Sequence, residues 1–239
     1  HVDAESLPTR PELLLKSIES NHPIYYFGVG SNMLRSKVEG RSHDGSRIEI
    51  ISFEPGFAPG YRLAFNSRTF PPLEPAMASI EPILPQDSSC WTQCGALHPN
   101  ADNSCHGALV QLNPDQYAKL WRSEGGGTNA QTYEEIVVTV YPYYNADDSN
   151  SNNKKEPVQA IALRVRQHNR LRQDMCPSVR YMTLLCQGAA ELGLQEHYQQ
   201  WLRDHPVQPV LSWMVHKLSL YNLVVYMMSR TTLKRPSIT

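Results

Sequence analysis

Residues 25–34, "YYFGVGSNML", decide the fold, because an apolar β-forming run there meets turn-forming residues. The aromatic run favours a buried strand, and Gly28 and Gly30 then allow backbone conformations that other residues resist. Glycines after a strand can turn successive backbone N–H groups into one concavity that binds a carboxylate or phosphate, and Ser31 and Asn32 add short polar side chains. The spacing is not G-x-G-x-x-G. On its own, the stretch predicts either a plain turn or an anion-binding loop.

The composition indicates one large globular domain that does not bind nucleic acid. The chain has 239 residues, 41% of them hydrophobic, and a formal net charge of -1. Such a balance creates no long-range field that would attract nucleic acid or an acidic membrane. The most apolar window, residues 210–228, contains His216, Lys217 and Asn222, which are costly inside a bilayer. We therefore expect no membrane span there, but a helix packed on the domain or on a second copy of the chain, as in a homodimer.

The cysteines indicate free thiols rather than a disulfide framework. An odd count of five, without a secretion signal, is typical of a reducing compartment such as the cytoplasm. Cys90 and Cys94, with His98 and His106 nearby, have a C-x3-C spacing with irregular histidines, which is a weak signal for zinc. We expect no metal site.

The order of expected elements predicts an α+β fold. Strands dominate the first two-thirds of the chain and helices the last third, which is typical of a curled, mostly antiparallel, barrel-like sheet packed by helices. We expect a domain over residues 1–206 and a helical C-terminal extension over 207–239. The polar segment Asn145–Lys155 predicts an exposed loop inside a hairpin. The expected helices cover 12–18, 113–124 and 178–206 (interrupted near Gly193), and the expected strands lie within 23–30, 46–66, 77–84, 105–112, 133–144 and 158–166.

Glu124 is the candidate acid/base. It lies where the helix that begins at Asn113 and Pro114 should end, and three glycines follow it. The glycines let the backbone bend around a ligand and leave the carboxylate at the edge of a pocket, where it could transfer protons near neutral pH. The alternative is a solvated glutamate beside an ordinary helix C-cap.

Tyr181 is the third candidate. Ser178 can cap a helix whose first turn contains Tyr181. The tyrosine is either a core aromatic with a solvated hydroxyl or a pocket wall that orients a substrate.

Together and in this order, the motifs resemble the γ-glutamylcyclotransferase-like family. That family has a Tyr-Gly-Ser-Asn loop, a His-Gly-hydrophobic strand, a Leu-Asp-x-x-Glu-Gly turn with a following tyrosine, and a Pro-Ser-x-x-Tyr helix start. Here these stand as "GVGSNM", "CHGALVQL", "LWRSEGGGTNAQTY" and "PSVRYMTLLCQGAAELGL". The resemblance spans roughly Tyr25 to Trp201.

The resemblance implies an intramolecular aminolysis that releases 5-oxoproline from a γ-glutamyl substrate without a cofactor. It implies that Glu124 is the general acid/base that transfers protons in this reaction. The residues implied in substrate binding are Gly28, Val29, Gly30, Ser31, Asn32, Met33, Tyr133 and Tyr181.

The departures from the family pattern indicate a wider pocket. Val29 stands in place of the loop tyrosine, Trp121 and Arg122 replace Leu-Asp, and the turn after Glu124 is long and rich in glycine. The wide turn and the apolar tail resemble the fungal gliotoxin-type branch, whose members trim γ-glutamyl groups from glutathione adducts. The alternatives are a general glutathione, γ-glutamyl-peptide or γ-glutamylamine cyclotransferase, a catalytically weakened γ-glutamyl-binding module, and a metal hydrolase.

Overall fold

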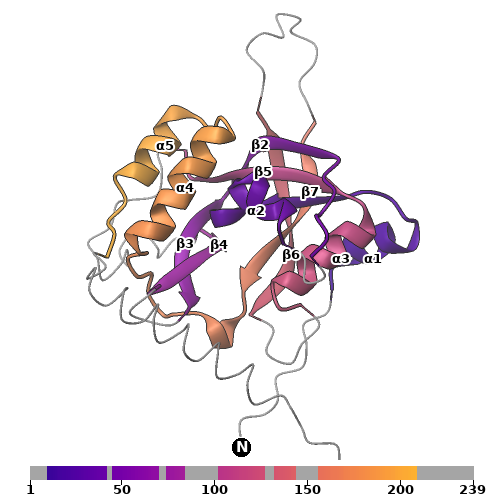
Figure 1. The fold of residues 1–239 in the computed structure, drawn as a ribbon, viewed down its shortest axis with the longest axis horizontal. Coiled ribbons are helices and arrows are strands. Elements are labelled where there is room, and N and C mark those ends of the chain that lie inside the picture. Colours follow the sequence, from indigo (N-terminus) through magenta and orange to yellow (C-terminus); the bar gives the residue numbers. More distant parts are fainter. Residues whose placement is uncertain are drawn as a thin grey trace, which may run out of the picture.

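The structure, a computed structural model, describes residues 10–41, 45–69, 74–83, 102–126, 132–143 and 156–208 (Figure 1). It confirms the expected α+β class, with a closed barrel packed by helices. Nearly all of the expected C-terminal extension and the whole Asn145–Lys155 loop lie outside the described residues. The proposed division at residue 206 and the proposed dimer therefore stay predictions. Within the described ranges, no helix is both long and apolar enough to cross a membrane.

The barrel has five strands in the order β1-β5-β2-β6-β7. Neighbouring strands are antiparallel except β1 and β7, whose parallel pairing closes the barrel. The hairpin expected around the polar loop is confirmed, because β6 and β7 pair in register along their length. The strands are β1 (Ile24–Gly28), β2 (Ser52–Pro59), β5 (Ser104–Leu112), β6 (Tyr133–Pro142) and β7 (Val158–Val165).

Two further strands, β3 (Tyr61–Arg68) and β4 (Ala76–Pro82), form a separate antiparallel sheet. β2 and β3 are consecutive in the chain but belong to different sheets. Gly60 joins them with a φ of +75°, a left-handed conformation that glycine adopts without strain. The strand–turn–strand pattern of residues 46–66 therefore marks a change of sheet rather than a hairpin.

The helices lie on two sides of the barrel in the view of Figure 1, with α4 and α5 on the left and α3 and α1 on the right. The expected cap of α4 is confirmed, since Ser178 Oγ accepts a hydrogen bond from the Tyr181 amide at 3.1 Å. Asn113 occupies the N-cap of α3 without a side-chain hydrogen bond. The helical segments are α1 (Glu12–Glu19), η1 (Gly30–Met33), α2 (Arg35–Glu39), α3 (Pro114–Ser123), η3 (Gln167–Asn169), α4 (Val179–Glu191) and α5 (Glu196–Arg203).

The cysteine prediction is partly wrong. Cys105 and Cys186 are free thiols, as expected, but Cys176 is disulfide-bonded. An odd count leaves at least one thiol unpaired, yet it does not exclude a pair between cysteines that the fold brings together from distant parts of the chain.

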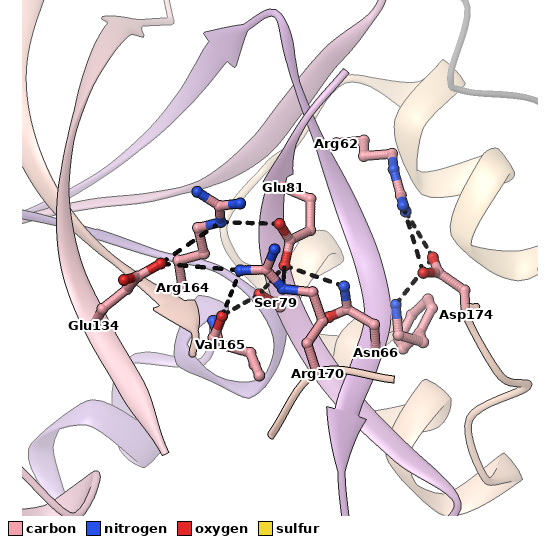
Figure 2. Close-up of polar contacts among 10 residues, drawn as sticks. Arg62, Asn66, Ser79, Glu81, Glu134, Arg164, Val165, Arg170 and Asp174 are labelled. Atoms are coloured by element: carbon pink, nitrogen blue, oxygen red, sulfur yellow. Dashed lines mark hydrogen bonds and ion pairs between the residues drawn. The ribbon is translucent and has the colours of Figure 1, made fainter. Parts of the chain in front are cut away.

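Buried ion pairs attach the small sheet to the barrel (Figure 2). Glu81 of β4 is 4% exposed and accepts a hydrogen bond from Arg164 of β7 at 2.9 Å. Its other oxygen lies 3.2 Å from Arg170 Nε. In a second link, the Val165 amide donates a hydrogen bond to Ser79 Oγ at 3.0 Å. Because a buried carboxylate needs charged partners to offset lost hydration, these contacts fix how β4 sits on β7.

We predict that Glu81→Gln lowers the free energy of unfolding by about 3 kcal/mol, because it leaves two arginines without their buried counter-charge. Glu134→Gln is the matched control: Glu134 approaches the same two arginines only to 3.9 Å and its side chain is 29% exposed. We expect the control to lose less than about 1 kcal/mol. Urea unfolding midpoints measure both, and equal losses would contradict the structural role of Glu81.

His205 makes stability depend on pH. Its ring lies 4.7 Å from Phe65 and 5.3 Å from Trp201, and burial lowers its pKa to about 4, with the charge of Asp174 partly offsetting that effect. An unfolded histidine has a pKa near 6.5, so between pH 6.5 and 4 the unfolded chain binds more protons than the folded one. Stability contributed by neutral His205 is therefore lost as the pH falls through this window.

We predict that acidification from pH 7 to 4.5 lowers the melting temperature less in His205→Phe than in the unchanged chain. In the unchanged chain, protonation of His205 accounts for up to about 3 kcal/mol of the free energy of unfolding that is lost, and the variant lacks this contribution. His22→Phe, at an exposed site, is the control and should leave the slope unchanged. Identical slopes for all three proteins would show that His205 is not the group responsible.

Candidate active site

A pocket brings together the expected strand loop, the end of α3, and residues of β4, β6, β7 and α4. Six of the nine residues implied by the resemblance line it: Val29, Ser31, Asn32, Glu124, Tyr133 and Tyr181. The remaining lining residues are Tyr26, Phe27, Arg41, Met77, Ala78 and Leu163.

Glu124 ends α3 and lies in the pocket wall with its side chain only 11% exposed. The alternative of a solvated glutamate is therefore wrong, because the side chain is mostly buried. The turn that positions it requires glycine at two places: Gly125 has a φ of +83°, and a Cβ on Gly126 would lie 2.2 Å from the Trp121 ring. The glycine run thus folds the chain back over Trp121 and leaves the carboxylate facing the pocket.

Arg41, which the sequence analysis missed, is the cationic partner of Glu124. Its NH1 lies 2.9 Å from Glu124 Oε1, and its NH2 donates to Ser31 Oγ at 3.1 Å. Its Nε is buried without a hydrogen-bond partner among the described residues. Arg41 follows the short helix α2 in a polar segment without periodicity, so no local signal distinguishes it from a surface arginine.

Asn32 connects the loop to Glu124. Its Nδ2 donates to Tyr26 OH at 2.8 Å and to Glu124 Oε1 at 3.2 Å. Because an ionised carboxylate only accepts hydrogen bonds, the amide nitrogen must face Glu124. The Oδ1 atom is then left buried and unpaired within the described part of the chain. Asn32 therefore offers a free acceptor beside the carboxylate, suited to a ligand that carries N–H groups.

Two tyrosines complete the wall. The Tyr181 hydroxyl accepts a hydrogen bond from the Ala78 amide at 3.2 Å and also interacts with the Ser31 backbone. Burial raises the pKa of Tyr133 to about 12, and the nearby charge of Glu124 adds to the rise. Burial also raises the pKa of Tyr181. Both side chains therefore stay neutral hydroxyls at physiological pH. Tyr181 is 4% exposed and lines the pocket, and its hydroxyl bonds protein groups rather than solvent. Its role in orienting a substrate stays a prediction.

The other three predicted residues shape the loop and do not line the pocket. Gly30 has a φ of +62°, and a Cβ there would lie 2.7 Å from Ala78 Cβ and 2.8 Å from Tyr181 OH. Gly28 lies close to the Asn32 carbonyl, and Met33 is buried beside Gly188 of α4. The loop folds as η1, in which the Asn32 amide donates to the Val29 carbonyl at 3.2 Å. That amide is therefore occupied and does not face a ligand.

A second polar cluster lies outside this pocket. The potential ligand atoms of Asp102, His106 and His197 lie within 4.8 Å of one another. Hydrogen bonds account for the cluster: His106 Nε2 is 2.7 Å from Asp102 Oδ2, and its other ring nitrogen bonds Tyr143 OH. Burial lowers the pKa of His106, so the ring is neutral near pH 7. The other three residues of the weak zinc signal, Cys90, Cys94 and His98, lie outside the described residues.

Comparison with known proteins identifies the class. Residues 104–202 match the AIG2-like family model. The gamma-glutamyl cyclotransferase gliK of Claviceps purpurea is 30% identical over 168 residues, covering 70% of this chain and 65% of that protein. Its namesake in Aspergillus fumigatus is 28% identical over 185 residues, covering 77% and 62%. The chain thus spans somewhat less than two-thirds of these relatives' length.

Solved structures agree at the level of the fold. A structure titled gamma-glutamyl cyclotransferase superposes with a TM-score of 0.57 at 18% identity, covering 80% of this chain and 92% of that one. In fold and in sequence, the chain resembles γ-glutamylcyclotransferase-like proteins. Within that class its sequence resembles the fungal gliK proteins, which confirms the expected resemblance to the gliotoxin-type branch.

We predict that Gly30→Ala destabilises the protein by more than the cost of a positive φ alone. Gly60→Ala is the control, since Gly60 has a φ of +75° with open space around its Cβ position. The control should lose about 1 kcal/mol, and Gly30→Ala a further 1–3 kcal/mol or so from overpacking. Urea unfolding measures both, and equal losses would show that the Gly30 environment can relax.

A double-mutant cycle tests the cause of the extra loss. Tyr181→Phe removes the oxygen that a Cβ at position 30 would meet at 2.8 Å. The loss caused by Gly30→Ala should therefore shrink by roughly 1 kcal/mol in the Tyr181→Phe background. If the stability losses of the two substitutions simply add, the Tyr181 hydroxyl is not the cause of the extra loss in Gly30→Ala.

Proposed function

We propose that the protein releases 5-oxoproline from a γ-glutamyl substrate by intramolecular aminolysis. The observation that carries this proposal is the placement of Glu124, a mostly buried carboxylate that lies 3.2 Å from Asn32 Nδ2 in a pocket walled by two neutral tyrosines. The names of the fungal relatives support the same reaction class.

Glu124 would carry the proton in both halves of the reaction. Its carboxylate takes a proton from the α-ammonium of the glutamyl group, and the freed amine attacks the γ-carbonyl carbon to form the new C–N bond of the five-membered ring. The bond from that carbon to the leaving amine then breaks, and Glu124 returns its proton to the leaving nitrogen. The ring nitrogen loses its second proton, and the released amine takes up a proton and leaves as an ammonium. Nucleophile and electrophile belong to one molecule, so the pocket's main contribution is to hold the curled, reactive conformation.

The other residues would hold the glutamyl group around Glu124. The free Oδ1 of Asn32 accepts from the α-ammonium, which directs that nitrogen toward Glu124. The Tyr133 and Tyr181 hydroxyls and the remaining loop amides are donors for the α-carboxylate and the developing oxyanion. The loop of residues 28–32 would thus form one wall of the glutamyl pocket.

The finer proposal concerns the substrate. We propose a bulky glutathione-derived conjugate, as in gliotoxin-type biosynthesis, because Val29 lines the pocket where the family has a tyrosine. Its smaller side chain leaves room for an apolar substituent, and about 100 Å² of extra burial would contribute about 2.5 kcal/mol before ordering costs. General glutathione or γ-glutamylamine turnover is the alternative within the enzyme class.

One observation favours a second candidate, a γ-glutamyl-binding module. The Arg41 guanidinium already pairs with Glu124 at 2.9 Å, so the carboxylate has a cationic partner within the pocket before any substrate binds. In the proposed reaction, a substrate carboxylate would draw Arg41 away from Glu124. If substrate binds tightly but no 5-oxoproline forms, the binding-module interpretation holds.

We predict that Glu124→Gln keeps the fold and lowers turnover by at least about a hundredfold, because glutamine cannot carry the proton. Glu134→Gln is the control, since Glu134 is not among the residues that line the pocket. The assay is 5-oxoproline release from a glutathione S-conjugate, followed by mass spectrometry, with circular dichroism as the check on folding. Near-normal turnover of Glu124→Gln would remove Glu124 from the mechanism.

A further inference from the structure

A second, more open pocket of about 820 Å³ adjoins the first. The two pockets share Ser31, Arg41, Met77 and Tyr181 in their linings, so a ligand can extend from one into the other. The glutamyl half of a substrate fills the first pocket under the proposed function. The half that leaves as an amine must then extend out of the first pocket, and the second pocket lies next to the first, where this half would be.

The second pocket is cationic. Lys37 of α2, Arg41 and Arg180 of α4 line it, and none of its lining residues is a carboxylate. Lys37 is exposed and makes no ion pair within the described ranges. These three cations line one hollow, although the whole chain carries a net charge of -1. Such a local excess of positive charge attracts an anionic ligand group.

The nearby carboxylates leave these cations with spare donors. Glu74 approaches Arg180 only to 3.3 Å and is already engaged at shorter range by Ser178, whose hydroxyl donates to it at 2.6 Å. Arg41 uses NH1 and NH2 on Glu124 and Ser31 and keeps an unpaired Nε. A guanidinium has five N–H donors, so Arg41 can hold a second anion.

We propose that this second pocket binds a carboxylate on the leaving half of the substrate. The protein would then select γ-glutamyl peptides that end in a free carboxylate, such as S-conjugates of glutathione, over γ-glutamylamines that lack one. A two-residue leaving group places its carboxylate about 7 Å beyond the cleaved bond, which is the scale of a neighbouring subsite. The inference rests on the proposed function and adds Lys37 and Arg180 as specificity residues.

The same arrangement would link the second pocket to Glu124. An anion drawn to Arg41 competes with Glu124 for the guanidinium, because the two would share one cation. Occupation of the second pocket by the correct leaving group would thereby loosen the ion pair that restrains the acid/base.

The test compares S-hexylglutathione with its C-terminal glycinamide, which differs only in lacking the terminal charge. We expect the intact chain to prefer the acid by about tenfold in kcat/KM, since each partly exposed charge pair contributes roughly two- to fivefold. The Lys37→Gln/Arg180→Gln double variant should reduce that preference to about twofold, with the loss falling mainly on KM. Raising the salt concentration should weaken the preference of the intact chain.

Arg35→Gln is the control, because Arg35 lies on the same helix as Lys37, pairs with Glu39 at 2.8 Å and does not line the second pocket. It should keep the preference of the intact chain. Equal kcat/KM for acid and amide in the intact chain, or a preference that survives in the double variant, would overturn the proposal.

The experiment also separates this inference from the proposed function. If neither compound yields 5-oxoproline, the proposed reaction fails, and calorimetric affinities for the same two compounds then decide the second pocket. Tighter binding of the acid that is lost in the double variant supports the carboxylate subsite, and equal affinities refute it.

Discussion

The Tyr181 hydroxyl is the contact on which the site depends, because three distant parts of the chain meet at that atom. It accepts a hydrogen bond from Ala78 of the small sheet, interacts with the Ser31 backbone, and occupies the space beside Gly30 that any larger residue would need. The start of α4, the strand β4 and the loop after β1 therefore cannot move independently. A buried hydroxyl without these partners would be costly, so the contact is favoured by polarity as well as by packing.

Around this contact, buried charges fix the relative positions of the elements. Glu81 binds β4 to β7 through arginines, and Asp174 accepts from Arg62 at 2.6 Å on the other strand of the small sheet. Figure 2 shows both carboxylates with the arginines that they bind. Ion pairs of this kind depend on the precise positions of the charged groups, whereas apolar contacts tolerate small displacements of the packed elements. The small sheet is thereby held to one position, which places Met77 and Ala78 in the pocket wall.

The sequence predicts those features that arise from local chemistry. The strand before Gly28, the cap at Ser178 and the glycine turn after Glu124 each follow from neighbouring residues, and the structure contains all three. Arg41 could not be found in this way, because its partner Glu124 lies far along the chain and nothing near Arg41 indicates the pairing. The same reason explains the separate small sheet, since it depends on which distant segments meet. The roles of the site residues in catalysis remain proposals.

The parallel pairing of β1 with β7 has a consequence for how the molecule forms. Residues 26 and 27 pair with residues 161 and 162, so the barrel closes only when segments some 135 positions apart meet. Closing so long a loop costs chain entropy before the contacts that reward it exist, and folds rich in such distant pairings reach the native state slowly. During synthesis β1 must wait, with one edge unpaired, until most of the chain has left the ribosome. The nascent chain is therefore open to wrong edge-to-edge association for longer than a protein built from local hairpins.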